Sequence, residues 1–181
     1  MTTNFSFFPA AWHDLTHTAA EAERQVYAAP MYAAMLCRKS LEEWVRWIYE
    51  HDGSLEMPYD TSLNALLHTP EFKELVAPSQ FNQINLVRKI GNNAVHTSVR
   101  VKPDEALYAV KLLYNFAGWV LRLYDDAGLE VPPFDSALVP QAPTADKTKE
   151  ELRQLEAAYL QSQEALQRLQ AELEEIKAAK A

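Results

Sequence analysis

Apolar residues recur at intervals of three and four along most of the chain, and this spacing constrains the fold more than any other feature. In residues 31–51, for example, it places Leu41, Trp44 and Ile48 on one face of a helix. Glycine, which β-sandwiches and Rossmann-type domains use in turns and phosphate loops, occurs only four times in 181 residues. We therefore predict an all-α fold, an antiparallel helical bundle followed by a C-terminal coiled-coil helix.

Prolines mark the ends of the predicted helices, because proline is accommodated in the first turn of a helix but not in its interior. Three aromatic residues in positions 5–8 are expected to pin the N-terminal segment to the bundle. Gly91 lies on the apolar side of its helix, where glycine is tolerated best if another backbone packs close. The predicted helices cover residues 9–29, 31–51, 79–97 and 103–127, with short helical turns at 62–67 and 71–76.

The sequence divides into three parts. Residues 1–128 hold the predicted bundle. Residues 129–145 contain four prolines and no helical spacing, which is typical of a semi-rigid linker, although Leu129, Val131 and Phe134 are candidates for packing on the bundle.

Residues 146–181 carry apolar residues at heptad spacing between Glu, Lys and Arg, with one polar interruption at Ser162. A helix this polar needs a partner helix to bury its apolar stripe, so we expect a homodimer through this segment. The predicted coiled-coil seam comprises Leu152, Leu155, Tyr159, Leu166, Leu169, Leu173 and Ile176.

Charge and composition exclude several classes of protein. The net charge is −8, which does not favour generic nucleic-acid binding, and a single cysteine excludes an internal disulfide or a multi-cysteine metal site. The chain has no apolar run of membrane-spanning length and no basic signal-peptide region, so a cytoplasmic protein is expected. Because no phosphate loop, nucleophile elbow or HExxH motif occurs, we expect neither a cofactor nor a metal in this chain.

One segment departs from the acidic average. No acidic residue occurs between Ser79 and Lys102, and four cations there are candidates for binding nucleic acid: Arg88, Lys89, Arg100 and Lys102.

Within this segment, RKIGNNAVH places polar side chains along one helix, and two interpretations are open. In the first, His96, Arg88 and Asn92 are candidate catalytic residues for phosphodiester cleavage, with histidine as acid or base and arginine stabilising the developing charge. In the second, these groups are structural and fix the register of the helices. That polar network would contain Arg38, Glu42, Asn92 and His96, with Glu42 holding His96 or Arg88 in place.

Several separated blocks resemble one known family. NFSFFPAAW, YAAMLCRKSLEEWVRWIYEHDGSLEMPYDTSLNALLH, VRKIGNNAVH and EALYAVKLLYNFAGWVLRLY occur in that order and are similar to the N-terminal domain of type I restriction enzyme R subunits. The resemblance covers roughly residues 4–126 and implies a HEPN-like helical bundle. Many HEPN proteins are ribonucleases with four to six residues between a motif Arg and His, whereas Arg88 and His96 enclose seven.

The resemblance implies an accessory or assembly domain whose expected contacts are DNA or other subunits of a restriction complex. The parent enzyme of that family is an ATP-dependent, Mg²⁺-dependent deoxyribonuclease, and its nuclease and translocase motifs are absent from these residues. The domain itself is therefore expected to be non-catalytic. The alternatives are a HEPN-like ribonuclease or toxin, and a scaffold that only dimerises.

Overall fold

The computed structural model describes residues 2–96, 100–125, 128–141, 153–165, 167 and 168. Among these residues every regular element is a helix, and no strand occurs, so the predicted all-α class is confirmed. The chain forms two compact units, Met1–Ala142 and Pro143–Ala181.

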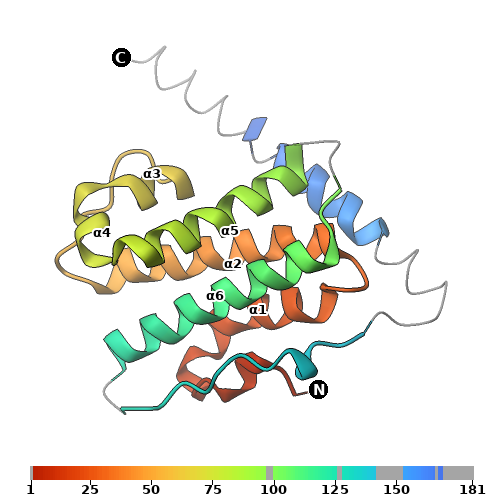
Figure 1. Ribbon diagram of the computed structural model, residues 1–181. Coiled ribbons are helices and arrows are strands. Elements are labelled where there is room, and N and C mark those ends of the chain that lie inside the picture. The colour runs from red at the N-terminus through yellow and green to blue at the C-terminus, as the bar shows by residue number, and fades with distance from the viewer. Residues whose placement is uncertain (1, 97–99, 126–127, 142–152, 166, 169–181) are drawn as a thin grey trace. The chain divides into compact units, whose positions relative to one another are not determined.

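Four long helices build the first unit (Figure 1). α2 contacts each of the other three, and α1 and α5 both also contact α6. The apolar stripes meet between these helices, where Trp44, Ile48 and Leu113 are fully buried. The long helices are α1 (His13–Gln25), α2 (Pro30–His51), α5 (Pro78–His96) and α6 (Pro103–Tyr124).

Two short helices, α3 (Leu63–His68) and α4 (Pro70–Leu75), connect α2 to α5, as predicted. Ser62 caps the first, because its Oγ accepts a hydrogen bond from the Ala65 N–H at 3.3 Å. Thr69 caps the second in the same way by accepting from Phe72.

The first predicted helix is too long at both ends. A 3₁₀ turn, η2 (Ala10–Trp12), precedes α1, and α1 ends at Gln25 rather than near Ala29. A proline disfavours helical backbone angles in the residue before it. Ala29, which precedes Pro30, accordingly has φ −145° and ψ 71°, outside the helical region.

The last long helix, α6, also ends early, at Tyr124 instead of residue 127. Asp125 is extended there, with φ −108° and ψ 120°, and its carboxylate accepts a hydrogen bond from the Trp12 indole N–H at 2.9 Å. This contact with the N-terminal region draws the chain out of the helical path.

The N-terminal segment packs into the bundle as predicted. It forms a 3₁₀ turn, η1 (Asn4–Phe7), and buries Phe5 and Phe8. The Phe5 ring meets the Tyr114 ring at 5.5 Å between centroids, and the Phe8 ring meets the Trp44 ring at 6.1 Å. These contacts join the segment to both α2 and α6.

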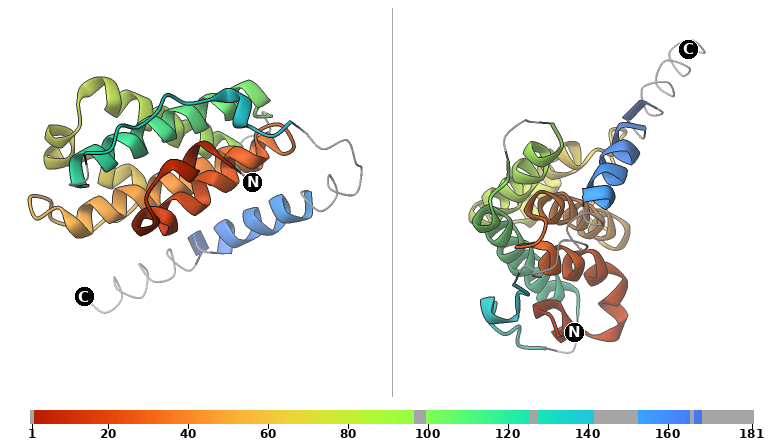
Figure 2. Two further views of the ribbon diagram at one scale, coloured as in Figure 1. Left: turned by 90° about the horizontal axis from the view of Figure 1, so that it is seen from below. Right: turned by 90° about the vertical axis from the view of Figure 1, so that its right-hand side faces the viewer.

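The first compact unit extends to Ala142, beyond the predicted end of the bundle at residue 128 and into the predicted semi-rigid linker that begins at 129. This proline-rich segment runs beside α6 in both views of Figure 2. Tyr114 donates a hydrogen bond to the Pro132 carbonyl at 2.9 Å, Phe134 packs against the Tyr114 ring, and Val131 packs on Gly118. The segment also contains a short 3₁₀ turn, η3 (Ser136–Leu138).

The second unit is helical over residues 153–165 and at 167 and 168. Of the predicted seam, Leu155 is exposed and Tyr159 is half-buried. The other seam residues lie outside the described part of the chain: Leu152, Leu166, Leu169, Leu173 and Ile176.

Candidate nucleic-acid interface

The candidate site is built on the close contact between α2 and α5. Gly91 makes this approach feasible, because a Cβ atom there would overlap the Arg38 Cβ and would lie 3.0 Å from the Ala34 carbonyl oxygen. Another backbone does pack close to Gly91, which is the condition under which glycine is best tolerated on the apolar side of a helix. The contact brings Arg38 of α2 beside the α5 turn that carries Arg88.

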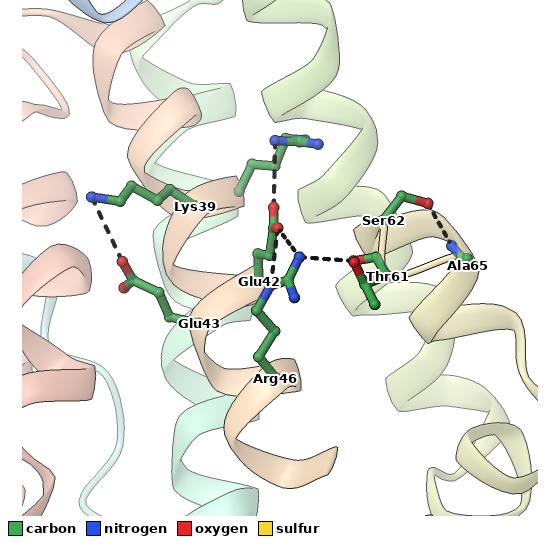
Figure 3. Close-up of polar contacts among 8 residues, drawn as sticks. Lys39, Glu42, Glu43, Arg46, Thr61, Ser62 and Ala65 are labelled. Carbon is green, nitrogen blue, oxygen red and sulfur yellow. Dashed lines mark hydrogen bonds and ion pairs between the residues drawn. The ribbon is translucent and has the colours of Figure 1, made fainter. Parts of the chain in front are cut away.

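Glu42 links two arginines on α2 (Figure 3). Its carboxylate lies 3.0 Å from Nη2 of Arg46 and 3.8 Å from Nη1 of Arg38, one helical turn away on either side. Arg46 also donates to the Thr61 carbonyl at 2.8 Å, which ties α2 to the segment before α3. The predicted association of Arg38 with Glu42 is confirmed, and Arg46 holds the carboxylate more closely.

Arg88 is half-buried on α5, and its Nε donates a hydrogen bond to Oδ1 of Asn85 at 3.0 Å. Burial lowers the pKa of Arg88, and the positive charge of Arg38 lowers it further. Two guanidinium groups from different helices therefore lie close enough to repel each other.

The predicted polar network forms only in part. Glu42 pairs with the two arginines of its own helix and does not hold Arg88 in place. Asn92 is half-buried, and no described residue hydrogen-bonds its side chain. His96 is the last residue of α5, and its side chain lies outside the described part of the structure.

The remaining nucleic-acid-binding candidates are solvent-exposed. Lys89 lies on α5, and Arg100 and Lys102 lie in the connector that leads into α6. Lys102 is the N-cap residue that precedes α6, and its N–H donates to the Glu105 carboxylate at 2.8 Å. These side chains are available to a partner that approaches from solvent.

Three further features of the described residues bear on function: the state of the cysteine, the grouping of possible metal ligands and the apolar character of the helices. Cys37 is fully buried, and burial raises the pKa of its thiol, so the reactive thiolate is disfavoured. No group of three or more His, Cys, Asp or Glu residues there is arranged to hold a metal ion. Across the same residues, no helix combines the length and apolar character needed to cross a bilayer.

A comparison of the sequence with known families gives a match. Residues 20–132 match the family described as Domain of unknown function (DUF4145). The chain belongs to the DUF4145 family. No curated protein and no solved structure gives a significant match to it.

The DUF4145 region contains α2, α5 and α6 complete, and with them Arg38, Glu42, Arg46 and Arg88. The 3₁₀ turns at the N-terminus and the helical residues 153–165, 167 and 168 lie outside it.

Two polar residues of this DUF4145 site were not predicted. Arg46 follows Glu42 by four residues, a spacing that favours an ion pair on a helix and was readable from the sequence. Asn85 precedes Arg88 by three residues, which permits the same type of contact. The proximity of Arg38 to Arg88 has no such local signal, because it depends on how α2 and α5 pack.

Proposed function

We propose that this DUF4145 protein is a non-catalytic accessory domain, a HEPN-like bundle of the kind that opens type I restriction enzyme R subunits, and that it contacts nucleic acid. The order of the sequence blocks supports the proposal, and the DUF4145 region includes three of them wholly or in large part. In this proposal the ATP- and Mg²⁺-dependent cleavage of DNA belongs to other parts of the parent restriction enzyme.

The excess of positive charge at the α2–α5 contact is the observation that carries the proposal. Arg38 and Arg46 share the carboxylate of Glu42, and the guanidinium group of Arg88 lies near that of Arg38 without an ion pair to this carboxylate. Exposed Lys89, Arg100 and Lys102 extend the positive charge along a stretch of sequence without acidic residues. A local basic surface on an acidic chain favours a specific anionic partner over unspecific adsorption.

The exposed cations provide the direct test. Replacing Lys89, Arg100 and Lys102 together by glutamine is expected to weaken binding to duplex DNA. The slope of a plot of log K, where K is the association constant for DNA, against the logarithm of the salt concentration should also become shallower. The decrease should be roughly 0.9 for each phosphate that the variant no longer neutralises. Fluorescence anisotropy with a labelled duplex, repeated at several salt concentrations, measures both quantities.

A triple variant at other exposed cations, Lys111, Arg122 and Arg153 changed to glutamine, makes the same change in net charge elsewhere. Absence of binding by the unmodified protein, or equally weakened binding in both triple variants, would contradict the proposal.

The ribonuclease alternative is supported by one observation, that α5 carries Arg88, Asn92 and His96 at intervals of four residues. Labelled RNA included in the same experiments distinguishes the two functions. Cleavage by the unmodified protein that disappears in His96→Ala would favour the ribonuclease over the accessory domain.

We also propose that the C-terminal helix joins two copies of the chain. Leu155, a predicted seam residue, is 47% exposed within the second unit, as expected for a position that a partner helix covers. Leu155→Glu is expected to convert a dimer to a monomer in sedimentation velocity. Gln161→Glu adds the same charge at an exposed position outside the seam and should leave the dimer intact. A monomeric unmodified protein at micromolar concentration would exclude this assembly.

A further inference from the structure

Arg38 of α2 and Arg88 of α5 lie near each other at the α2–α5 contact and are poorly compensated by the protein itself. Arg38 lies 3.8 Å from Glu42, beyond hydrogen-bonding distance, while Arg46 approaches the same carboxylate to 3.0 Å. The Nε atom of Arg38 is buried and has no hydrogen-bond acceptor among the described residues. A buried cationic donor without an acceptor is costly, and an anion bound at the partly exposed Arg38 side chain would offset that cost by neutralising its charge.

Arg88 is also only partly paired within the protein. Its Nε donates to Asn85, which fixes the plane of the guanidinium group and leaves the two Nη groups without a partner among the described residues. Its positive charge lies near that of Arg38, whose ion-pair partner among the described residues is Glu42 at 3.8 Å, a carboxylate that is shared with Arg46. Bringing like charges together lowers stability unless a counter-charge binds.

Asn92 adds a neutral donor to this surface. It follows Arg88 by four residues and therefore lies on the same side of α5. Its half-buried side chain is hydrogen-bonded by no described residue. The amide group can donate to a ligand oxygen beside the two guanidinium groups.

We infer that Arg38 and Arg88, assisted by Asn92, form a binding site for one phosphate group. This inference deepens the proposed contact with nucleic acid and rests on it for the source of the phosphate. A carboxylate is satisfied by the fork of one arginine, because its two oxygens lie in one plane. A phosphate presents oxygens in several directions and can accept hydrogen bonds from two arginine forks that belong to different helices.

The phosphate can come from an internal phosphodiester of a nucleic acid strand or from a terminal phosphomonoester. Both share the charge and the non-bridging oxygens that the arginines recognise. If the site binds a terminal phosphate, affinity should depend on a phosphate at the end of the strand. If it binds an internal phosphodiester, affinity should not depend on one.

The first measurement uses inorganic phosphate as the probe and the whole chain as the protein. Phosphate is expected to raise the melting temperature of the unmodified protein more than that of Arg38→Gln or Arg88→Gln, at equal ionic strength in chloride and phosphate. Phosphate also stabilises proteins in general, because it is excluded from their surface. This general effect is the same in each variant, so the difference in melting-temperature shift between proteins reports binding at the site. Lys111→Gln, which removes an exposed cation from α6, should respond like the unmodified protein.

The second measurement uses oligonucleotides with a 5′-phosphate or a 5′-hydroxyl. Each arginine variant is expected to bind about tenfold more weakly, since it lacks one charge-assisted hydrogen-bonding group. An equal weakening with both oligonucleotides assigns the site to internal phosphodiesters, and a weakening confined to the 5′-phosphorylated strand assigns it to the terminal group.

Arg38→Lys distinguishes a loss of binding from a folding defect. Lysine keeps the positive charge and most of the aliphatic stem but lacks the planar guanidinium group and its paired donors. It should melt like the unmodified protein and still bind more weakly than that protein does.

The outcomes separate this inference from the proposed function. Unchanged binding and an unchanged phosphate response in both arginine variants would overturn the phosphate site, even if the exposed cations prove to bind DNA. A phosphate response that requires Arg38 and Arg88, in a protein that binds no nucleic acid, would retain the site and remove the proposed function. Arginine-dependent binding of an acidic peptide without any response to phosphate would assign the site to carboxylates and overturn the inference.

Discussion

Gly91→Ala is expected to lower the free energy of unfolding by about 2 kcal/mol, although alanine is the better helix former. The added methyl group would overlap the Arg38 Cβ and would lie 3.0 Å from the Ala34 carbonyl oxygen and 3.2 Å from the Arg38 Cδ. Overpacking costs about 1–3 kcal/mol, and the overlap with the Arg38 Cβ places this substitution at the upper end; a gain of about 1 kcal/mol in helix propensity then leaves a net loss of about 2 kcal/mol. Chemical denaturation monitored by circular dichroism measures the difference.

Gly53→Ala is the control, because a Cβ at Gly53 meets nothing within 4 Å and the residue is outside every helix. It should leave the free energy of unfolding within about 0.5 kcal/mol of the original value. A Gly91→Ala protein as stable as the unmodified one would show that α5 can move away from α2 without cost. In that case the Arg38–Arg88 proximity would not be fixed by this contact.

Glu23→Ala should lower the free energy of unfolding by about 3 kcal/mol, the largest effect expected for a single polar side chain here. Glu23 is fully buried on α1 and accepts hydrogen bonds from the Asn4 N–H at 3.1 Å and from its Nδ2 at 3.2 Å. Alanine would leave the buried Asn4 N–H without an acceptor and release η1 from the bundle. Denaturant titration quantifies the destabilisation.

Glu21→Ala is the matched control on the same helix. Glu21 forms a partly exposed ion pair with Arg24 at 2.8 Å, so its removal should cost about 0.5 kcal/mol. A similar decrease in stability in both variants would mean that burial of Glu23 contributes nothing specific.

The pH dependence gives a second readout of Glu23. Burial raises its pKa above the ordinary value of 4.5, and the hydrogen bonds from Asn4 offset only part of that rise. A raised pKa in the folded state means that the stabilising contribution is complete below 4.5 and is lost as pH rises through the folded-state pKa. The stability advantage of the unmodified protein over Glu23→Ala is therefore expected to be larger at about pH 5 than at about pH 8.

Sequence periodicity predicted the long helices well, because each buries one continuous stripe. α2 and α6 begin at Pro30 and Pro103, where proline fits the first turn, and the caps at Ser62 and Thr69 belong to short helices that were also predicted. The early ends of α1 and α6 were missed. They depend on the residue before Pro30 and on a hydrogen bond between Trp12 and Asp125, residues 113 positions apart.

The candidate site was predictable only where its contacts are local. The Arg38–Glu42 pair follows from a spacing of four on one helix. The proximity of Arg38 to Arg88 and the burial of Glu23 each require tertiary packing, since a charged residue on an amphipathic helix is expected to face solvent. Asn4, the partner of Glu23, lies 19 positions earlier in an irregular segment, where periodicity carries no information.

The two ends of the first unit are fastened to each other. Asn4 donates from Nδ2 to the Asp135 carbonyl at 3.0 Å, and its Oδ1 accepts from the Asp135 N–H at 2.7 Å. A pulling force applied between these two places would load both hydrogen bonds together, along with those that hold Asn4 to Glu23 of α1. Mechanical tension between the two ends would thus be resisted first by these hydrogen bonds. The α2–α5 contact would keep its geometry until they had broken.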